Sequence, residues 1–392
     1  MKFLYSKHTK DNLRNKGLLI IVILAVISIG TFLLTGSHAA TPYASITADQ
    51  GTLTSGATKQ TCTGASDGSC VMFGSVSSGG GGGSSTTDCF ASPGKCGYPD
   101  PNFNNNTGAT SVGSTTACAS LTASGSVTAS TNGQTIQNLN ITGGIAVNAP
   151  NVTINNVCVK DPNGGSGELA ITIESGSTNL LIEHTTVAGA SSTNALDTGI
   201  WNASNISSVT ANNVYIYNAA EDWHGSGTVT NSYMQAGATY SGSHNEDIYL
   251  SDTSITLTHD TLLNSTGQTA VLFGDNDGGS KDIPADNHWV VKNSLMAGGG
   301  YLMYLDANNG SMPVGSSTMD IENNRFGRCL GATHFDGSGT TCQGLADGAN
   351  DGYGYFPNGG YYGGPVDDYC SGSGQTWLNN LWDDNNTVVA CN

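Results

Sequence analysis

The chain contains few charged residues, and basic residues are the scarcest of them. Only 11% of its 392 residues are charged, with 12 Lys and Arg against 30 Asp and Glu, which gives a formal net charge of −18. Several of the basic residues lie near the N-terminus, namely Lys2, Lys7, Lys10, Arg14 and Lys16. The rest of the chain is therefore strongly acidic, and such a surface repels nucleic acid and other polyanions. We expect no nucleic-acid partner, and the acidic surface is typical of a soluble extracellular protein.

Helical patterns and metal motifs are also missing. No window offers the roughly 10 to 12 residues of helical periodicity that an amphipathic helix needs, which disfavours βαβ units. The 54 Gly residues, together with abundant Ser, Thr and Asn, are typical of an all-β protein with many tight turns. The absence of CxxC, HxxxH, HExxH and P-loop patterns disfavours a zinc site and a nucleotide triphosphatase.

One short stretch recurs along the chain. VTINNVCV at Val152–Val159 returns as VTANNVYI at Val209–Ile216, and looser copies follow. In each copy, alternating apolar residues reach an Asn or His, after which a second short strand begins. These polar residues are Asn138, Asn156, His184, Asn213, Asn231, His259, Asn293 and Asn323, with Asn380 as a further candidate. A repeat of roughly 20–35 residues indicates a solenoid, and the period of 2 within each copy indicates strands.

The repeat predicts an all-β fold, a right-handed single-stranded parallel β-helix with C-terminal capping loops. Each strand would pair with its copies in the coils before and after it. The Asn and His residues would stack at a common bend, with each side chain bonded to the next at the strand spacing of about 4.8 Å.

The N-terminal part predicts an export segment at residues 1–40. Basic residues precede the apolar run Leu18–Leu34, and Ser37-His38-Ala39 is similar to a signal cleavage site. The run is also close to the length of a membrane-spanning helix, so cleavage and retention as an anchor both remain open. The protein is therefore expected to be secreted or at the cell surface, with this segment as its membrane contact.

Three further regions follow. We expect a small disulfide-closed β segment at 41–74, a flexible Gly/Ser linker at 75–87 and the β-helix domain at 88–392. Residues 88–131 would form the approach to the solenoid and its first coil, and would cover the open end of the tube.

The chain has 10 cysteines, an even number that predicts disulfides in an exported protein. Connectivity does not follow from sequence. Our working pairs are Cys62–Cys70, Cys89–Cys96, Cys118–Cys158, Cys329–Cys342 and Cys370–Cys391.

Several motifs resemble those of bacterial secreted proteins of the pectate-lyase-like superfamily. They include CGYPDP, NVTINNVCV, SHNEDI, NNRFGR and LNNLWDDN, and they span residues 96–386. The resemblance implies a right-handed parallel β-helix, and the superfamily includes polysaccharide lyases, hydrolases, epimerases, tailspikes and adhesins. The Asp/Arg constellation of pectate lyases does not map here, because after the N-terminal segment only Arg325 and Arg328 remain. The Arg-x-Lys motif of polygalacturonase-like hydrolases is absent as well.

Two matching triplets carry the candidate chemistry. Glu221-Asp222-Trp223 and Glu246-Asp247-Ile248 stand about one coil apart, so coils in register would make Asp222 and Asp247 neighbours. Two adjacent carboxylates share a proton or hold a cation, and either arrangement serves glycan chemistry. The alternative is that these residues cap turns or face solvent, and a register error of one residue would turn Asp247 to the opposite face.

The expected groove has further members. We assign catalytic roles to Asp222, Asp247, His244, Glu221 and Glu246, and substrate contacts to Trp223, His224 and Tyr304. Asp275 and Asp277 flank a turn with oxygen ligands suited to Ca²⁺, although no EF-hand glutamate follows. We therefore expect either no cofactor or Ca²⁺.

Two functions remain open at this point. The first is a secreted glycoside hydrolase or polysaccharide lyase that works through the paired carboxylates. The second is a non-catalytic adhesin or glycan-binding protein that uses the β-helix as a rigid rod. Both predict a polysaccharide or surface glycan as the partner and a monomeric chain.

Overall fold

A computed structural model describes residues 57–61, 69–73, 89, 92–103, 107–109, 118–161, 163–251, 253–265, 269–275, 288–304, 318–327, 366–367, 375–383 and 385–390. The chain divides into two compact units, Met1–Val76 and Ser77–Asn392. In the first unit, β1 (Ala57–Thr61) pairs antiparallel with β2 (Ser69–Phe73). The expected export segment and Gly/Ser linker lie outside the described residues. Within the described residues, no helix has the length and apolar character needed to cross a bilayer.

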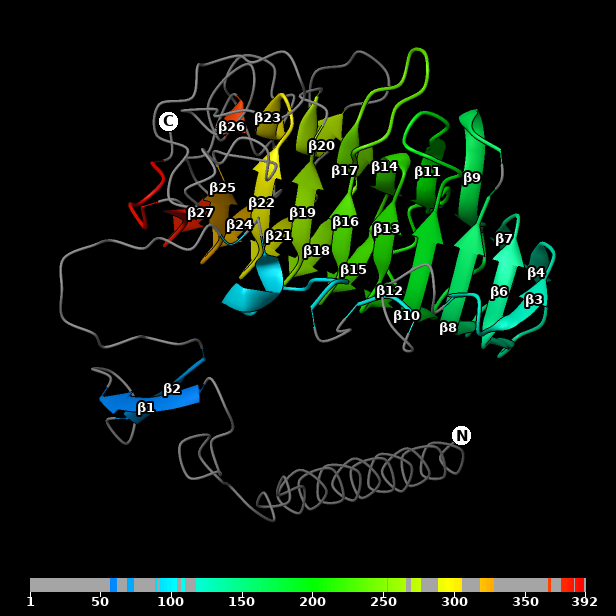
Figure 1. The fold of residues 1–392 in the computed structure, drawn as a ribbon, viewed down its shortest axis with the longest axis horizontal. Coiled ribbons are helices and arrows are strands. Elements are labelled where there is room, and N and C mark those ends of the chain that lie inside the picture. The colour runs from blue at the N-terminus through cyan, green and yellow to red at the C-terminus, as the bar shows by residue number, and fades with distance from the viewer. Residues whose placement is uncertain are drawn as a thin grey trace, which may run out of the picture. The chain divides into compact units, whose positions relative to one another are not determined.

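The second unit consists of parallel strands that pair from coil to coil along three faces (Figure 1). The first face contains β5 (Thr135–Gln137), the start of β8 (Thr153–Lys160), the start of β10 (Leu180–Ala188), β12 (Val209–Asn212), β15 (Gly227–Thr230), β18 (Ile255–Thr258), β21 (His288–Lys292), β24 (Thr318–Glu322) and β27 (Gln375–Leu378). The second face contains β3 (Thr122–Ser124), β6 (Leu139–Thr142), the ends of β8 and β10, β13 (Tyr215–Tyr217), β16 (Tyr233–Gln235), β19 (Thr261–Asn264), β22 (Leu295–Gly298), β25 (Arg325–Gly327) and β28 (Leu381–Trp382).

The third face forms a sheet of its own and carries the candidate site. It contains β4 (Val127–Ala129), β7 (Ile145–Val147), β9 (Gly165–Ile173), β11 (Leu196–Trp201), β14 (Ala219–His224), β17 (Glu246–Ser251), β20 (Ala270–Asp275), β23 (Tyr301–Tyr304) and β26 (Val366–Asp367). The prediction of an all-β chain with long parallel sheets is confirmed. Each coil follows one strand on each face in turn, which is the strand order of a solenoid.

The bend between the first and second faces forms where the sequence places its recurring Asn and His. These residues adopt left-handed backbone angles, with φ of 54° at Asn156, 46° at His184 and 59° at His259. Asn tolerates this conformation better than most residues because its short polar side chain bonds locally. The last bend falls at Asn379, with φ 54°, and not at Asn380 as the sequence suggested. Asn380 is the buried residue that follows.

Side chains at this bend bond between coils, as expected, although the partners vary. The Asn156 amide donates to Asn138 Oδ1 at 2.8 Å. His259 Nδ1 lies 2.7 Å from Asn231 Oδ1. The Asn231 amide in turn donates to Asn212, the residue before the expected partner, at 2.9 Å.

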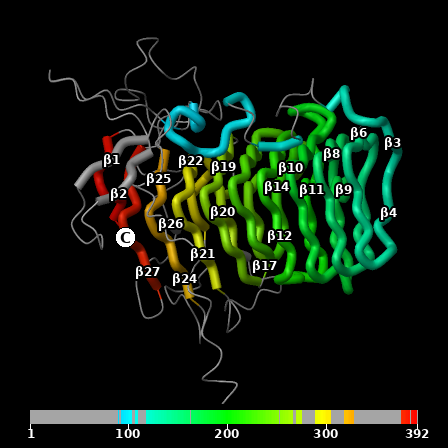
Figure 2. The backbone as a smooth tube through the Cα atoms, turned by 90° about the horizontal axis from the view of Figure 1, so that it is seen from below, coloured from blue at the N-terminus to red at the C-terminus, as the bar shows by residue number. Residues whose placement is uncertain are grey.

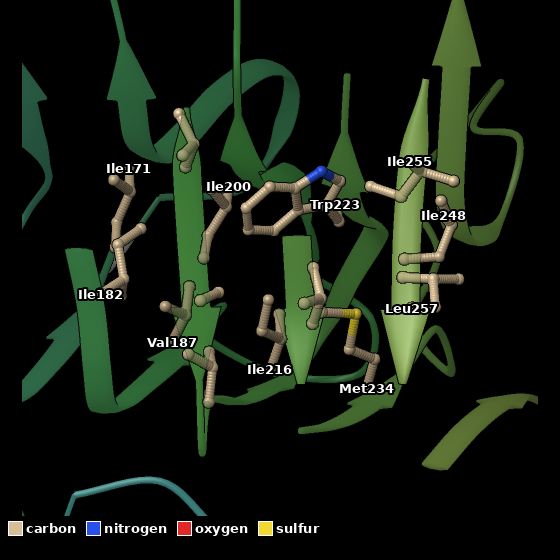
Figure 3. Close-up of a cluster of buried hydrophobic side chains, with 14 of the residues drawn as sticks. Ile171, Ile182, Val187, Ile200, Ile216, Trp223, Met234, Ile248, Ile255 and Leu257 are labelled. Carbon is tan, nitrogen blue, oxygen red and sulfur yellow. The ribbon is translucent and has the colours of Figure 1, made fainter. Parts of the chain in front are cut away.

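The core consists of apolar side chains that repeat once per coil on each face. Ile182, Ile216 and Ile248 represent the three faces, and each is fully buried. Figure 3 shows such side chains converging inside the tube, with the indole of Trp223 among them. Burying an aliphatic side chain contributes about 1.5–3 kcal/mol, so stability accumulates coil by coil.

Directly after the bend, a buried polar residue continues from coil to coil. Ser232 N–H donates to Asp260 Oδ1 at 2.8 Å, and Asp260 N–H donates to Ser294 Oγ at 3.0 Å. Ser294 N–H donates to Asn324 Oδ1, and Asn324 N–H donates to Asn380 Oδ1. These side chains satisfy backbone groups that the tight bend removes from the strand ladders.

The described residues between 89 and 109 form a strap along the outside of the second face (Figure 2). It includes the short 3₁₀ helix η3 (Pro93–Cys96). The strap contacts late coils first and early coils last: Cys89 N–H donates to Asp383, His259 Nε2 lies 2.8 Å from Gly97 O, and Gly108 N–H donates to Asn213 O. This segment was expected to cover the open end of the first coil, and it instead covers an apolar surface along the side that includes Leu263 and Leu295.

One disulfide lies within the strap and a second joins Cys118 to β8. Cys89–Cys96 and Cys118–Cys158 are both formed, as the working pairs predicted. Cys62, Cys329, Cys342, Cys370 and Cys391 lie outside the described residues, and so does the side chain of Cys70.

Candidate functional site

The structure brings Asp222 and Asp247 together on adjacent strands of the third face. Their neighbours pair in register, Glu221 with Glu246 and Trp223 with Ile248. Asp222 and Asp247 are both 0% exposed, so they do not line an open groove as the sequence suggested. Asp247 Oδ1 accepts the N–H of Ala236 at 3.2 Å and that of Leu263 at 3.1 Å. These donors belong to the second face, so the pair is enclosed between the second and third faces.

Burial controls the protonation of this acid pair. It raises the pKa of Asp222 well above its usual value, and the neighbouring carboxyl of Asp247 raises it further. Burial also raises the pKa of Asp247, opposed by the N–H groups of Ala236 and Leu263 and by a hydrogen bond from Asp222. A carboxylate beside another carboxylate in a dry site favours one shared proton. The arrangement therefore favours one proton shared between Asp222 and Asp247.

Two other expected members of the groove are also enclosed. Glu246 is 0% exposed, and so is Trp223, whose Nε1–H donates to Gly225 O at 2.8 Å. Trp223 packs in the apolar core and does not contact solvent, so the expected sugar contact at this residue is wrong. His244 is exposed in the connection between β16 and β17. None of the described contacts joins it to the acid pair.

Glu221 and His224 lie on the outer side of the third face. Glu221 Oε2 accepts the hydroxyl of Thr198 at 3.0 Å and lies 2.8 Å from His224 Nδ1. The side chains of His224 and Glu221 are 22% and 17% exposed, which leaves both accessible to a ligand. They lie at the edge of an open depression of about 210 Å³, lined by Gly167, Leu169, Asp197, Thr198, Trp201, Glu221 and His224.

Asp197 supplies the second carboxylate of this depression. Its Oδ2 accepts Gly167 N–H at 2.6 Å, and its Oδ1 accepts the Tyr240 hydroxyl. Burial and this hydrogen bond raise the pKa of Tyr240, so the phenol remains a donor to Asp197. Asp197 was not among the residues singled out from the sequence.

An aromatic stripe continues from the depression along the third face. We define it as Trp201, His224, Tyr249, Phe273 and Tyr304, one ring from each of β11, β14, β17, β20 and β23. The ring centroids are 6.3 Å apart between Trp201 and His224, then 4.4, 5.4 and 5.0 Å at the following steps. All five side chains are partly exposed.

The stripe forms because outward residues in register stack at the strand spacing. In each strand the aromatic residue directly follows an inward one, as Tyr249 follows Ile248 and Phe273 follows Leu272. Adjacent strands lie about 4.8 Å apart, which is the distance at which rings in offset or tilted contact stabilise each other. Of the residues predicted to contact substrate, His224 and Tyr304 belong to the stripe. The others in it were missed, although an apolar residue followed by an aromatic one in successive third-face strands was a readable signal.

The side chains of the expected calcium ligands lie outside the described residues. Asp275 ends β20, but its side chain lies outside the described residues, and so does Asp277. In the described part of the chain, no three His, Cys, Asp or Glu side chains gather closely enough to hold a metal ion. Ca²⁺ therefore stays an expectation from the sequence.

The depression can bind a polar group with two carboxylates, a hydroxyl and an imidazole, and the stripe can bind flat apolar surfaces beside it. Comparisons with family models, with curated proteins and with solved structures found no match to this chain.

Proposed function

We propose that the protein binds an extracellular polysaccharide along the third face, and that its solenoid is a right-handed parallel β-helix of the pectate-lyase-like class. The observation that carries the proposal is the aromatic stripe, which continues over five successive third-face strands and ends in a polar depression. Ring faces pack against the C–H faces of sugars, while carboxylates and hydroxyls bond to sugar hydroxyl groups. Ligand sites commonly combine apolar walls with a few polar groups in this way.

The direction of the stripe favours a polymer over a single sugar. Successive rings advance along the tube by one strand spacing, about 4.8 Å. An extended chain of pyranose rings laid along the third face would meet ring after ring. Several weak stacking contacts then add up within one ligand, which is how multivalent binding raises affinity.

The disulfides support an extracellular location. Cys89–Cys96 and Cys118–Cys158 are formed, and disulfides persist in oxidising compartments. The acidic surface and the predicted export segment agree with secretion or display at the cell surface.

Binding without cleavage is the form of the proposal that the geometry supports best. The acid pair Asp222 and Asp247 is fully buried, so a glycan on the surface does not reach it. Hydrolysis is a second candidate, because Asp197 and Glu221 line one depression and Glu221 is bonded to His224. A pair of accessible carboxylates is the minimum that glycoside hydrolysis needs.

Binding to a panel of immobilised neutral, acidic and amino polysaccharides tests the proposal. Tyr249→Ala, in the middle of the stripe, should weaken binding by up to about tenfold, since ring contacts contribute about 0.5–1.5 kcal/mol. Tyr217→Ala is the matched control, because this ring also stacks on a neighbour, Tyr215 at 4.7 Å, but on the second face. Equal loss in both variants, or no binding to any polysaccharide, would remove the proposal.

The same samples separate binding from hydrolysis. Reducing ends are measured after long incubation with each polysaccharide that binds. Release that disappears in Glu221→Gln would establish the hydrolase, whereas binding without release supports the binding protein. Release that persists in Glu221→Gln but disappears in Asp222→Asn would show that the buried pair reaches substrate after all.

A further inference from the structure

The strands of the third face carry acidic residues and no Lys or Arg. Among the described side chains of this face, the acidic ones that are partly exposed are Glu168, Asp197 and Glu221, whereas Asp222, Glu246 and Asp247 are buried. The described basic residues lie elsewhere. Lys292 on the first face pairs with Asp320 and Glu322, and Arg325 on the second face pairs with Asp383.

The carboxylates that reach solvent gather at one end of the aromatic stripe. Asp197 and Glu221 line the depression beside Trp201 and His224. The bonds from Thr198 and His224 both fall on Glu221 Oε2, so Oε1 remains for a ligand. A cationic ligand would therefore meet a carboxylate oxygen and aromatic faces in the same place.

These features select among glycans. A polyanionic glycan such as a uronate polymer would be repelled by a face that carries only negative charge. An ammonium group gains binding free energy from two interactions. It forms a charge-assisted hydrogen bond with the carboxylate, and the ring faces attract it through cation–π contacts. A neutral sugar gains only the stacking contacts.

We infer that the ligand of the third face is a linear glycan of unacetylated amino sugars, whose ammonium groups bind Glu221 and Asp197 while its rings lie along the aromatic stripe. This inference rests on the proposed glycan-binding function and specifies its substrate class. The inferred ligand also differs in charge from the acidic polysaccharides that pectate lyases bind.

Matched oligosaccharides test the charge directly. β-1,4-linked glucosamine oligomers and their N-acetylated counterparts have the same length and linkage and differ in charge. Titration calorimetry in a weakly acidic buffer keeps the amines protonated and the carboxylates ionised. We expect the amino oligomer to bind about tenfold more tightly than the acetylated one, and added salt to reduce that difference.

Two variants assign the preference to the site. Glu221→Gln should bring the amino oligomer close to the affinity of the acetylated one, and leave the acetylated one within about twofold. Glu183→Gln removes the same charge from β10 on another side of the tube and should leave both affinities unchanged. Thermal unfolding of each variant confirms that it is folded.

The outcomes separate this inference from the proposed function. Equal binding of the two oligomers, or a preference that persists in Glu221→Gln, overturns the amino-sugar inference but leaves glycan binding intact. Tighter binding of polygalacturonate than of the amino oligomer overturns it as well. No binding of any glycan would overturn both.

Discussion

The carboxyl group of Asp222 meets that of Asp247 on the neighbouring strand, and neither is exposed to solvent. The contact lies between the second and third faces, where Val271 occupies the equivalent buried position one coil later. One side of the pair is shaped by Gly199, where an added Cβ would come within 2.8 Å of Asp222 O. Two acids thus stand where a solenoid core would ordinarily place aliphatic side chains.

This acid pair predicts that stability falls as pH rises. The folded protein raises the pKa of both carboxyls above their unfolded value of about 3.9, so the folded state binds more protons than the unfolded state above that pH. The stabilisation is complete below about pH 4 and is lost as pH rises through the folded pKa values. The slope for one proton is about 1.4 kcal/mol per pH unit.

Asp222→Asn should flatten this dependence. The amide can still donate to Asp247 but no longer titrates, so the variant should gain stability relative to the parent above about pH 4 and gain nothing below it. Urea unfolding at a series of pH values measures the difference. A variant curve parallel to that of the parent would show that the pair does not share a proton.

A second buried acid makes a separate prediction. Burial raises the pKa of Asp260 well above its usual value, and its Oδ1 already accepts Ser232 N–H. Two coils further on, the Asn324 amide at the same position donates to Val291 O at 2.8 Å. Asp260→Asn should make the corresponding bond and stabilise the protein at neutral pH by about 1 kcal/mol.

The reverse exchange provides the control. Asn324→Asp introduces a buried acid that loses the amide donor, so it should destabilise by about 1–3 kcal/mol at neutral pH and less in acid. Thermal unfolding of both variants at neutral and at acidic pH measures these stability changes. Changes of the same sign in the two variants would contradict the explanation.

The ion pair of the last coil predicts a large loss of stability when its cation is removed. Arg325 Nε donates to Asp383 Oδ1 at 2.6 Å, and Asp383 is 0% exposed. Arg325→Gln leaves a buried carboxylate without its cation and should cost about 3 kcal/mol. Lys292→Gln breaks a partly exposed pair with Asp320 and should change stability little. Equal effects would mean that burial does not decide the strength of these pairs.

The Cys118–Cys158 disulfide should stabilise the first coils. Cys118–Cys158 closes a loop with a sequence separation of 40, for which chain entropy suggests about 4 kcal/mol. Replacing both cysteines with serine should expose the early coils to proteolysis before the later ones. Mass spectrometry of the fragments identifies the first cleavage sites. Initial cleavage in the late coils would refute this role.

Much of the coil arrangement follows from sequence because the bend has a strict requirement. A left-handed backbone favours Asn, so residues such as Asn156 and Asn213 mark each coil without any knowledge of packing. The same reasoning predicted that Asp222 and Asp247 are neighbours. It missed the bend at Asn379, because two adjacent Asn residues satisfy the pattern equally well.

The orientation of the acid pair could not be derived in this way. Consecutive residues on a strand point to opposite sides, so register shows which residues are neighbours and leaves open which of Glu221 and Asp222 faces solvent. Sequence reasoning placed both Asp222 and Trp223 in the groove. Both are buried, which strict alternation along the strand would not produce. The strap was also unpredictable, because nothing local in residues 89–109 specifies contacts with coils that follow it by hundreds of residues.

The strap also changes how the tube can come apart. An ordinary solenoid frays from either free end, since each coil is held only by its neighbours. Here the chain that leads into the first coils is held by Asp383 in the last one and by His259 midway. Unfolding of the final coil would therefore release the lead-in chain from its anchor. Unfolding at one end of the tube would then weaken the structure at the other end.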